Sequence, residues 1–182
     1  MMIKTCPVCK EDTLSNSEQE PGLFSSKCGK CAGVFVSAEQ YSQWLRAHGP
    51  NLPELPVDTE VELVSGESVG AKFCPQCRFM LMKYKVGHNV GFSLNRCGHC
   101  GGMWFDKNEW DILKSRNLHD DVHVIFSHTW QSKVRADERA AFLDAALRKE
   151  LGEEDFYELR RIKEWMDAHP KSAQLFAFLM RK

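Results

Sequence analysis

Four C-x-x-C pairs constrain this chain more than any other feature. They begin at Cys6, Cys28, Cys74 and Cys97, and they contain all eight cysteines of the 182 residues. A C-x-x-C turn directs two sulfur atoms at one point, so two such turns can complete a tetrahedral zinc site. The sequence therefore predicts two zinc ions per chain, each bound by four cysteines. The predicted ligand sets are Cys6, Cys9, Cys28, Cys31 and Cys74, Cys77, Cys97, Cys100.

The two sets belong to an internal duplication. The segment AGVFVSAEQYSQWL at 32–45 aligns with GGMWFDKNEWDILK at 101–114, so that Phe35 matches Trp104 and Tyr41 matches Trp110. We call the first C-x-x-C pair of each copy its proximal knuckle and the second pair its distal knuckle. The proximal knuckles, 6–9 and 74–77, are 68 residues apart, and the distal knuckles, 28–31 and 97–100, are 69 residues apart. Because each copy contains a complete ligand set, we expect no ligand to be shared between copies.

Each copy is predicted to be a zinc ribbon of short antiparallel strands followed by a short helix. Ser37 with Gln40, and Asp106 with Glu109, have the spacing of a helix-capping box. The fold class is therefore a small zinc-stabilised α+β protein with two tandem ribbons and an α-helical C-terminal region. The predicted parts are 1–50 (first ribbon and helix), 51–71 (acidic, proline-containing linker), 72–118 (second ribbon and helix) and 119–182 (connector and helices).

Several finer elements follow from local patterns. Asn16 is predicted to lie in a turn, and 61–64 to form a short strand in the linker. The alternation of Val122, Val124 and Phe126 favours a short strand or an irregular connector. Helices are expected from Gln131 onwards, with breaks at 151–152 and 169–170, because glycine and proline interrupt helices.

Composition and charge narrow the class of protein. Hydrophobic residues make up 43% of the chain and the net charge is −1, which is typical of a globular protein. No apolar run approaches the length of a membrane span and the first residues show no signal core, so we expect a cytoplasmic protein without a membrane partner. Only 74–118 are basic, with seven lysines and arginines against three acidic residues. This excess is modest, so a protein partner ranks above nucleic acid.

The duplicated unit, CP-x-C followed by CG-x-C-[GA]-G, resembles the transcription-factor-IIB-type zinc-finger family, which is found widely in bacterial proteins of unassigned role. The resemblance covers 4–47 and 72–115 and is most specific in CGHCGGMWFD, which begins at Cys97. In the first copy, Ala32 replaces a glycine and Ser37 replaces the acid. The resemblance implies a zinc-ribbon fold, and by family name alone a connection with transcription.

Two classes of function follow. A four-thiolate zinc site has no open coordination position, and no catalytic set is visible, so the first hypothesis is a non-enzymatic adaptor that contacts a protein or nucleic acid. The alternative is a thiol redox or metal-responsive protein with exchangeable cysteines. The tetrapeptide CGHC at 97–100 matches the active site of disulfide isomerases. A second knuckle at ribbon spacing favours metal binding.

Other residues near the knuckles have structural explanations that we favour. The cations at positions 10, 30, 78 and 99 are expected to offset thiolate charge rather than to bind phosphate. Trp104, Phe105 and Trp110 are expected to pack in the core rather than to stack on nucleobases. Glu109 is explained as a helix cap. A third metal site at His119, His123 and His128 is disfavoured, because no further ligands lie nearby.

The C-terminal helices carry more apolar surface than they can bury. Phe156, Leu159, Ile162 and Met166 form one helical stripe, and 175–179 add further apolar side chains. We expect this surface to pack on Trp104 and Trp110 first, and on a second copy of the chain as the next alternative.

Overall fold

The computed structural model describes residues 5–10, 13–49, 52, 65–87 and 90–181. The predicted linker strand at 61–64 lies outside them. The chain divides into two compact units, Met1–Val134 and Arg135–Lys182. Residues 119–134, which were predicted to belong with the C-terminal helices, are therefore part of the first unit. Within the described residues, no helix is both long enough and apolar enough to cross a membrane.

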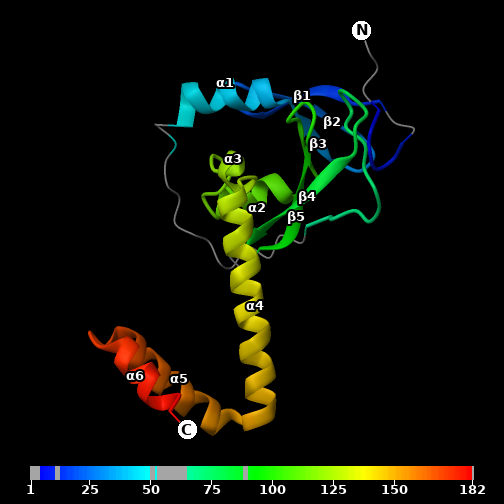
Figure 1. Ribbon diagram of the computed structural model, residues 1–182. Helices are drawn as coiled ribbons and strands as arrows, with labels where there is room; N and C mark the ends of the chain where they lie inside the picture. Colours follow the sequence, from blue (N-terminus) through cyan, green and yellow to red (C-terminus); the bar gives the residue numbers. More distant parts are fainter. Residues whose placement is uncertain (1–4, 11–12, 50–51, 53–64, 88–89, 182) are drawn as a thin grey trace. The chain divides into compact units, whose positions relative to one another are not determined.

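One six-stranded antiparallel sheet contains the strands of both copies (Figure 1). Its order is β1-β2-β3-β6-β5-β4, so the two ribbons are fused through β3 and β6 rather than merely arranged in tandem. The α+β class is confirmed. Asn16 lies in β1 opposite Ser26 and not in a turn. The strands are β1 Ser15–Glu20, β2 Leu23–Lys27, β3 Val34–Val36, β4 Leu81–Gly87, β5 Val90–Cys97 and β6 Met103–Phe105.

The pairing of β3 with β6 gives the sheet a local two-fold symmetry. Phe35 lies opposite Trp104, its own equivalent in the other copy. The neighbouring pairs are Val34 with Phe105 and Val36 with Met103, and exchanging the copies converts one pair into the other. The duplication therefore folds as a dimer within one chain.

Two equivalent glycines allow the copies to approach closely. A Cβ atom on Gly33 would lie 2.2 Å from Cζ2 of Trp104, and one on Gly102 would lie 2.6 Å from Cζ of Phe35. Real Cβ atoms do not approach other atoms so closely. Each copy thus leaves space, in place of a side chain, for the central aromatic ring of the other copy.

The two faces of the sheet have separate cores. Phe35 and Trp104 pack with the knuckle cysteines on one face. On the other face, helices α1 (Ala38–His48), α2 (Glu109–Ser115) and α3 (Val122–Ile125) bury the main apolar core. There Trp110 packs against Trp44 and Phe105, with ring centroids 6.0 and 5.2 Å apart. The expected core roles of Trp104, Phe105 and Trp110 are confirmed, and residues of the first unit account for their burial.

The connector after α2 is helical, which corrects the prediction of a strand or irregular segment at 122–126. Val122 and Ile125 are both fully buried at a separation of three residues, a helical spacing. The hydroxyl of Tyr41 lies 2.9 Å from the carbonyl oxygen of His119 and 2.8 Å from that of Asp120, and it accepts the N–H of Val122. A tertiary contact to the first copy therefore sets this conformation.

Side chains cover much of the outer edge of β4. The amide of Gln131 donates to the carbonyl of Lys85 at 2.8 Å and accepts from its N–H at 3.3 Å. The indole N–H of Trp130 donates to the carbonyl of Val86. At the start of the strand, the backbone N–H of Leu81 donates to the backbone carbonyl of Lys72. Such cover protects an edge strand from pairing with another chain.

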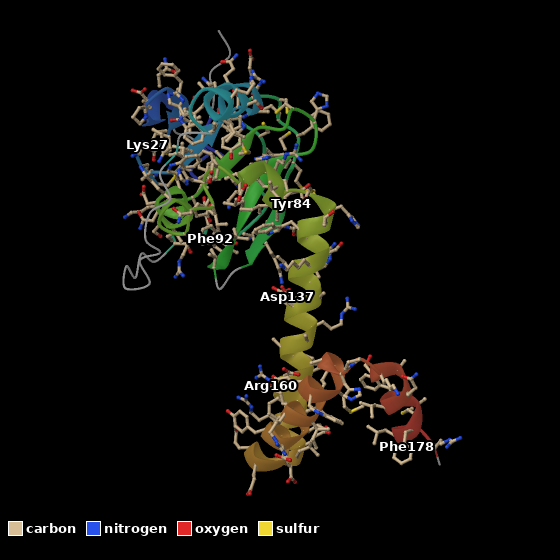
Figure 2. The ribbon with its side chains drawn as sticks, turned by 90° about the vertical axis from the view of Figure 1, so that its left-hand side faces the viewer. Lys27, Tyr84, Phe92, Asp137, Arg160 and Phe178 are labelled. Atoms are coloured by element: carbon tan, nitrogen blue, oxygen red, sulfur yellow. The ribbon has the colours of Figure 1, made fainter. Side chains whose placement is uncertain are left out.

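The second unit consists of helices. Helix α4 spans His128–Leu151 and begins in the first unit, and α5 (Glu153–Ala168) and α6 (Ser172–Leu179) follow. The predicted breaks at Gly152 and at His169 are confirmed. Among the large apolar side chains of this unit in the described residues, only Phe156 and Met166 are buried, whereas Phe178 is 70% exposed (Figure 2).

Candidate metal centres

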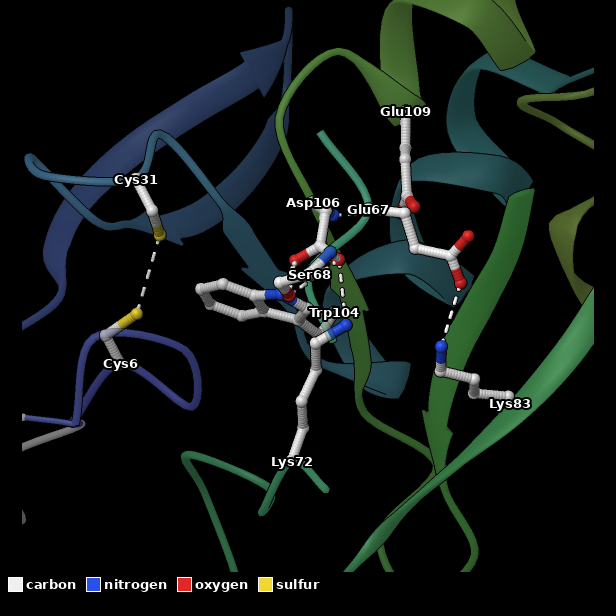
Figure 3. Close-up of polar contacts among 9 residues, drawn as sticks. All are labelled: Cys6, Cys31, Glu67, Ser68, Lys72, Lys83, Trp104, Asp106 and Glu109. Carbon is white, nitrogen blue, oxygen red and sulfur yellow. Dashed lines mark hydrogen bonds and ion pairs between the residues drawn. The ribbon is translucent and has the colours of Figure 1, made fainter. Parts of the chain in front are cut away.

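The structure brings the eight cysteines together in two sets of four, Cys6, Cys9, Cys28, Cys31 and Cys74, Cys77, Cys97, Cys100. The Sγ atoms of each set lie within 4.8 Å of one another. The Sγ atoms of Cys6 and Cys31 are 3.6 Å apart (Figure 3). Those of Cys77 and Cys97 are 3.3 Å apart. Sulfur atoms around a tetrahedral zinc lie about 3.8 Å apart, since each is about 2.3 Å from the metal. The donor sets therefore fit two zinc ions, one in each copy.

Repeated backbone geometry positions the thiols. After each proximal knuckle, the N–H of Lys10 or Arg78 donates at 2.9 Å to the carbonyl of the first cysteine, and both residues have a positive φ near 65°. After each distal knuckle, Ala32 and Gly101 make the equivalent bond at 3.0 Å, with φ of 58° and 71°. Ala32 thus adopts a conformation for which the other copy uses glycine.

The thiols of one set do not ionise alike. Burial raises the pKa of Cys97, but the N–H groups of Cys100 and His99 and the neighbouring thiols lower it more, so that it falls to about 7. Burial raises the pKa of Cys9 to about 11. A divalent cation would hold all four members as thiolates and release their protons. Four thiolates fill the coordination of zinc, so the ion would supply structural stability here.

A buried polar cluster surrounds the carboxylate of Asp106, just after β6. The carboxylate of Asp106 accepts from the ammonium of Lys72 at 2.8 Å and from the indole N–H of Trp104 at 2.7 Å (Figure 3). It also accepts from the backbone N–H of Ser68 at 2.9 Å. The side chains of Lys72 and Asp106 are both only 3% exposed. Their ion pair therefore fixes the ring of Trp104 in a setting of low dielectric.

This cluster corrects the capping role expected for Asp106. Its carboxylate accepts hydrogen bonds from Trp104, Lys72 and Ser68 instead. The residue before α2 is Asn108, which makes no side-chain capping bond. In the first copy the prediction is confirmed, because Ser37 Oγ accepts the N–H of Gln40 at 3.2 Å. Lys72 and Ser68 were not predicted. The one sequence signal for this cluster is that Trp104 and Asp106 of the second copy occupy the positions of Phe35 and Ser37 in the first copy.

Glu109 fulfils half of its expected role. Its Oε2 accepts the N–H of Asp106 at 2.9 Å, the return bond of a capping box. Its Oε1 is buried and has no hydrogen-bond partner among the described residues. Burial, together with the charge of Asp106, raises the pKa of Glu109 to about 8. The carboxyl group is therefore mainly protonated at neutral pH.

Replacing Glu109 with glutamine should remove one contribution to the pH dependence of stability. Unfolding restores the ordinary pKa of 4.5, so between that value and about 8 it releases a proton from Glu109. This contribution should lower the stability of the wild-type chain as the pH rises across the interval, by an amount on the order of a few kcal/mol, whereas the zinc-bound thiols impose the same opposite trend on both chains. The stability of Glu109→Gln relative to the wild type should therefore increase with pH. Chemical denaturation with zinc in excess at several pH values would measure it.

The control is Asp111→Asn, an exposed acid of the same helix. It should retain the wild-type pH dependence. A Glu109→Gln chain with the same pH dependence of stability as the wild type would show that Glu109 is not protonated in the folded state.

The three histidines do not form a metal site. His119 is buried between Trp44 and Trp110, with ring centroids 6.0 Å from each. His123 contacts the carbonyl of Asp120, and His128 lies 3.5 Å from the hydroxyl of Ser132. In the part of the chain that the structure describes, the two cysteine sets are the only groups of three or more metal-ligating side chains close enough to hold an ion.

Comparison with known families agrees with this geometry. The transcription factor zinc-finger family matches residues 73–116, which run from just before Cys74 to the end of α2. The second copy is therefore similar to the zinc ribbons of this family, as expected from the sequence. The comparisons with curated proteins and with solved structures give no match.

Proposed function

We propose that this chain is a non-enzymatic zinc-binding adaptor that contacts a macromolecular partner, with protein preferred over nucleic acid. Zinc at the two centres stabilises the first unit, and the second unit provides an apolar surface for binding. The observation that carries the proposal is the mismatch in the second unit between a very small core and a large exposed apolar surface. A link with transcription rests on the family match alone.

The exposed apolar side chains extend over all three helices of the second unit. Leu159 and Ile162 lie on the same stripe of α5 as the buried Phe156 and Met166, yet they are 47% and 41% exposed. The others are Phe142, Leu143, Leu147, Leu151, Tyr157, Trp165, Phe176, Phe178, Leu179 and Met180. A unit of this size needs more burial than two side chains to be stable, and so large an exposed apolar fraction favours an interaction site.

Charge favours protein as the occupant of that surface. Residues 135–182 contain ten lysines and arginines and ten acidic residues, so no single sign dominates. Several of these charges pair along α5, as Arg160 does with Glu164 and Arg161 with Glu158. A nucleic acid or an anionic membrane would need an excess of positive charge. A second copy of the chain offers an apolar surface and has no excess of either charge. We propose it as the first occupant.

Self-association through α5 should therefore be sensitive to charge on its apolar stripe. The double variant Leu159→Glu/Ile162→Glu should shift a wild-type dimer to monomer, because dimerisation would bury two unpaired carboxylates. We expect the dissociation constant to rise by about a hundredfold or more. Analytical ultracentrifugation over a range of concentrations would measure it.

The control is Gln174→Glu, which adds one charge at an exposed position of α6 and removes no apolar area. It should remain dimeric. A wild-type chain that is monomeric at its highest soluble concentration would rule out a second copy as the occupant.

The metal content separates the adaptor from a redox or metal-responsive protein. The adaptor should hold two zinc ions per chain, with thiols that resist alkylation until a strong chelator removes the metal. Substoichiometric zinc with rapidly alkylated cysteines would favour the alternative.

A further inference from the structure

A groove of about 400 Å³ lies between the proximal knuckles of the two copies. It is lined by Thr5, Cys6, Pro7, Lys10, Phe73 and Arg78. Lys10 and Arg78 are equivalent residues of the duplication, and so are Thr5 and Phe73. Both copies thus contribute matching positions to the groove, and it exists only because β3 pairs with β6.

Two positive charges line this groove from the two copies. Lys10 and Arg78 are both exposed, and each follows its knuckle with the same left-handed backbone and the same N–H bond to a cysteine carbonyl. Lys30 and His99 hold equivalent positions in the distal knuckles and can offset thiolate charge there. Lys10 and Arg78 partly offset the thiolate charge of the neighbouring centres, and because both are exposed they can also pair with carboxylates of a ligand.

The second copy also exposes several large apolar side chains, one of which, Phe73, lines the groove. Phe73, Phe79, Met80 and Met82 are between 49% and 56% exposed. Phe73 pairs with Met80 across an antiparallel bridge, and Phe79 stacks on His99 with centroids 4.3 Å apart. Among the described residues of the first unit, the other exposed large apolar side chains are only Phe24 and Val69. Aromatic residues, methionine and arginine are the types enriched where proteins bind proteins.

We infer that this groove binds an acidic peptide segment of a protein partner, with one apolar side chain packed against Phe73 and Pro7 and carboxylates paired with Lys10 and Arg78. The inference rests on the proposed adaptor function and names the chemistry of its partner. Single-stranded nucleic acid would also use aromatic rings and cations. The groove has two cations beside a mainly apolar wall, which suits a side chain better than a run of phosphates.

Titration of the zinc-loaded full chain with a defined peptide tests this site. The probe is a short glutamate-rich peptide with one central phenylalanine. Two matched peptides replace its glutamates with lysine or its phenylalanine with alanine. Amide NMR shifts should move at Lys10, Phe73 and Arg78 with the probe and not with either matched peptide. A short oligothymidylate serves as the nucleic-acid competitor.

Variants place the binding in the groove. The double variant Lys10→Gln/Arg78→Gln should lower the affinity for the peptide by roughly tenfold, and Phe73→Ala should lower it by a similar factor. The matched controls are Lys27→Gln and Phe24→Ala, exposed residues of β2, the latter 59% exposed against 55% for Phe73. Both controls should bind as the wild type does. Two zinc ions per chain by elemental analysis would show that a variant keeps its centres.

The inference is overturned if the wild-type chain shows no shifts at the groove, if the lysine peptide binds equally well, or if oligothymidylate binds more tightly than the probe. These outcomes need only the wild-type chain, so a variant that loses zinc does not obscure them. Zinc content and self-association do not depend on the groove. A chain with two zinc ions that dimerises but binds no peptide would therefore contradict this inference alone.

Discussion

The variant Cys97→Ser should lose the zinc ion of the second centre and unfold the first unit as a whole, which also weakens zinc binding at the first centre, while the helices of 135–182 stay formed in the proposed dimer. Cys97 is fully buried in the second centre. A structural zinc contributes on the order of 10 kcal/mol, which is comparable to the entire stability of a small domain. The two copies share one sheet and one cysteine-face core, so the first copy should not survive unfolding of the second. Elemental analysis and near-ultraviolet circular dichroism would measure the two effects.

The equivalent variant of the first copy, Cys28→Ser, provides a matched comparison. It should give the same loss of tertiary signal, because Cys28 is equally buried and the β3–β6 pairing couples both copies. Retention of two zinc ions by Cys97→Ser would contradict the assignment of that ligand. Separate unfolding transitions for the two copies would contradict their coupling.

Replacing Gly33 with alanine should destabilise the first unit by about 3 kcal/mol or more, at the upper end of overpacking effects. The added Cβ would meet the ring of Trp104 at 2.2 Å. That ring cannot easily move, because its N–H is bonded to Asp106, which is itself paired with Lys72. Gly102→Ala should act similarly against Phe35, at 2.6 Å. Thermal denaturation of the zinc-loaded chains would measure both.

Gly91→Ala is the control, since a Cβ on this strand residue would meet no atom within 4 Å. This variant should leave the midpoint of thermal denaturation almost unchanged. Gly33→Ala should cost less stability in a Trp104→Phe chain than in the wild type, because the smaller ring leaves room for the methyl group. If Gly33→Ala is as stable as the wild type, the close contact between the copies is not as the structure has it.

Much of this protein follows from local sequence. The knuckle turns need only residues within each C-x-x-C pair, so both cysteine sets could be predicted from spacing. The helix that begins after Ser37 and the helix breaks at Gly152 and His169 also follow from neighbouring residues, because capping and chain breaking act within one turn.

Contacts between distant segments could not be predicted in the same way. Strands β3 and β6 have three residues each and are buried on both faces, so no alternation shows which strand lies beside them. Their pairing joins the two ribbons and creates the groove between the proximal knuckles. The side chain of Asp106 does not cap α2, because it accepts hydrogen bonds from Lys72 and Trp104 in the folded chain. The segment 122–126 is helical where the hydroxyl of Tyr41 accepts the N–H of Val122. Spacing along the chain fixed the metal centres because their geometry is local. The sheet, the buried ion pair and the groove required the fold, since their partners are far apart in sequence.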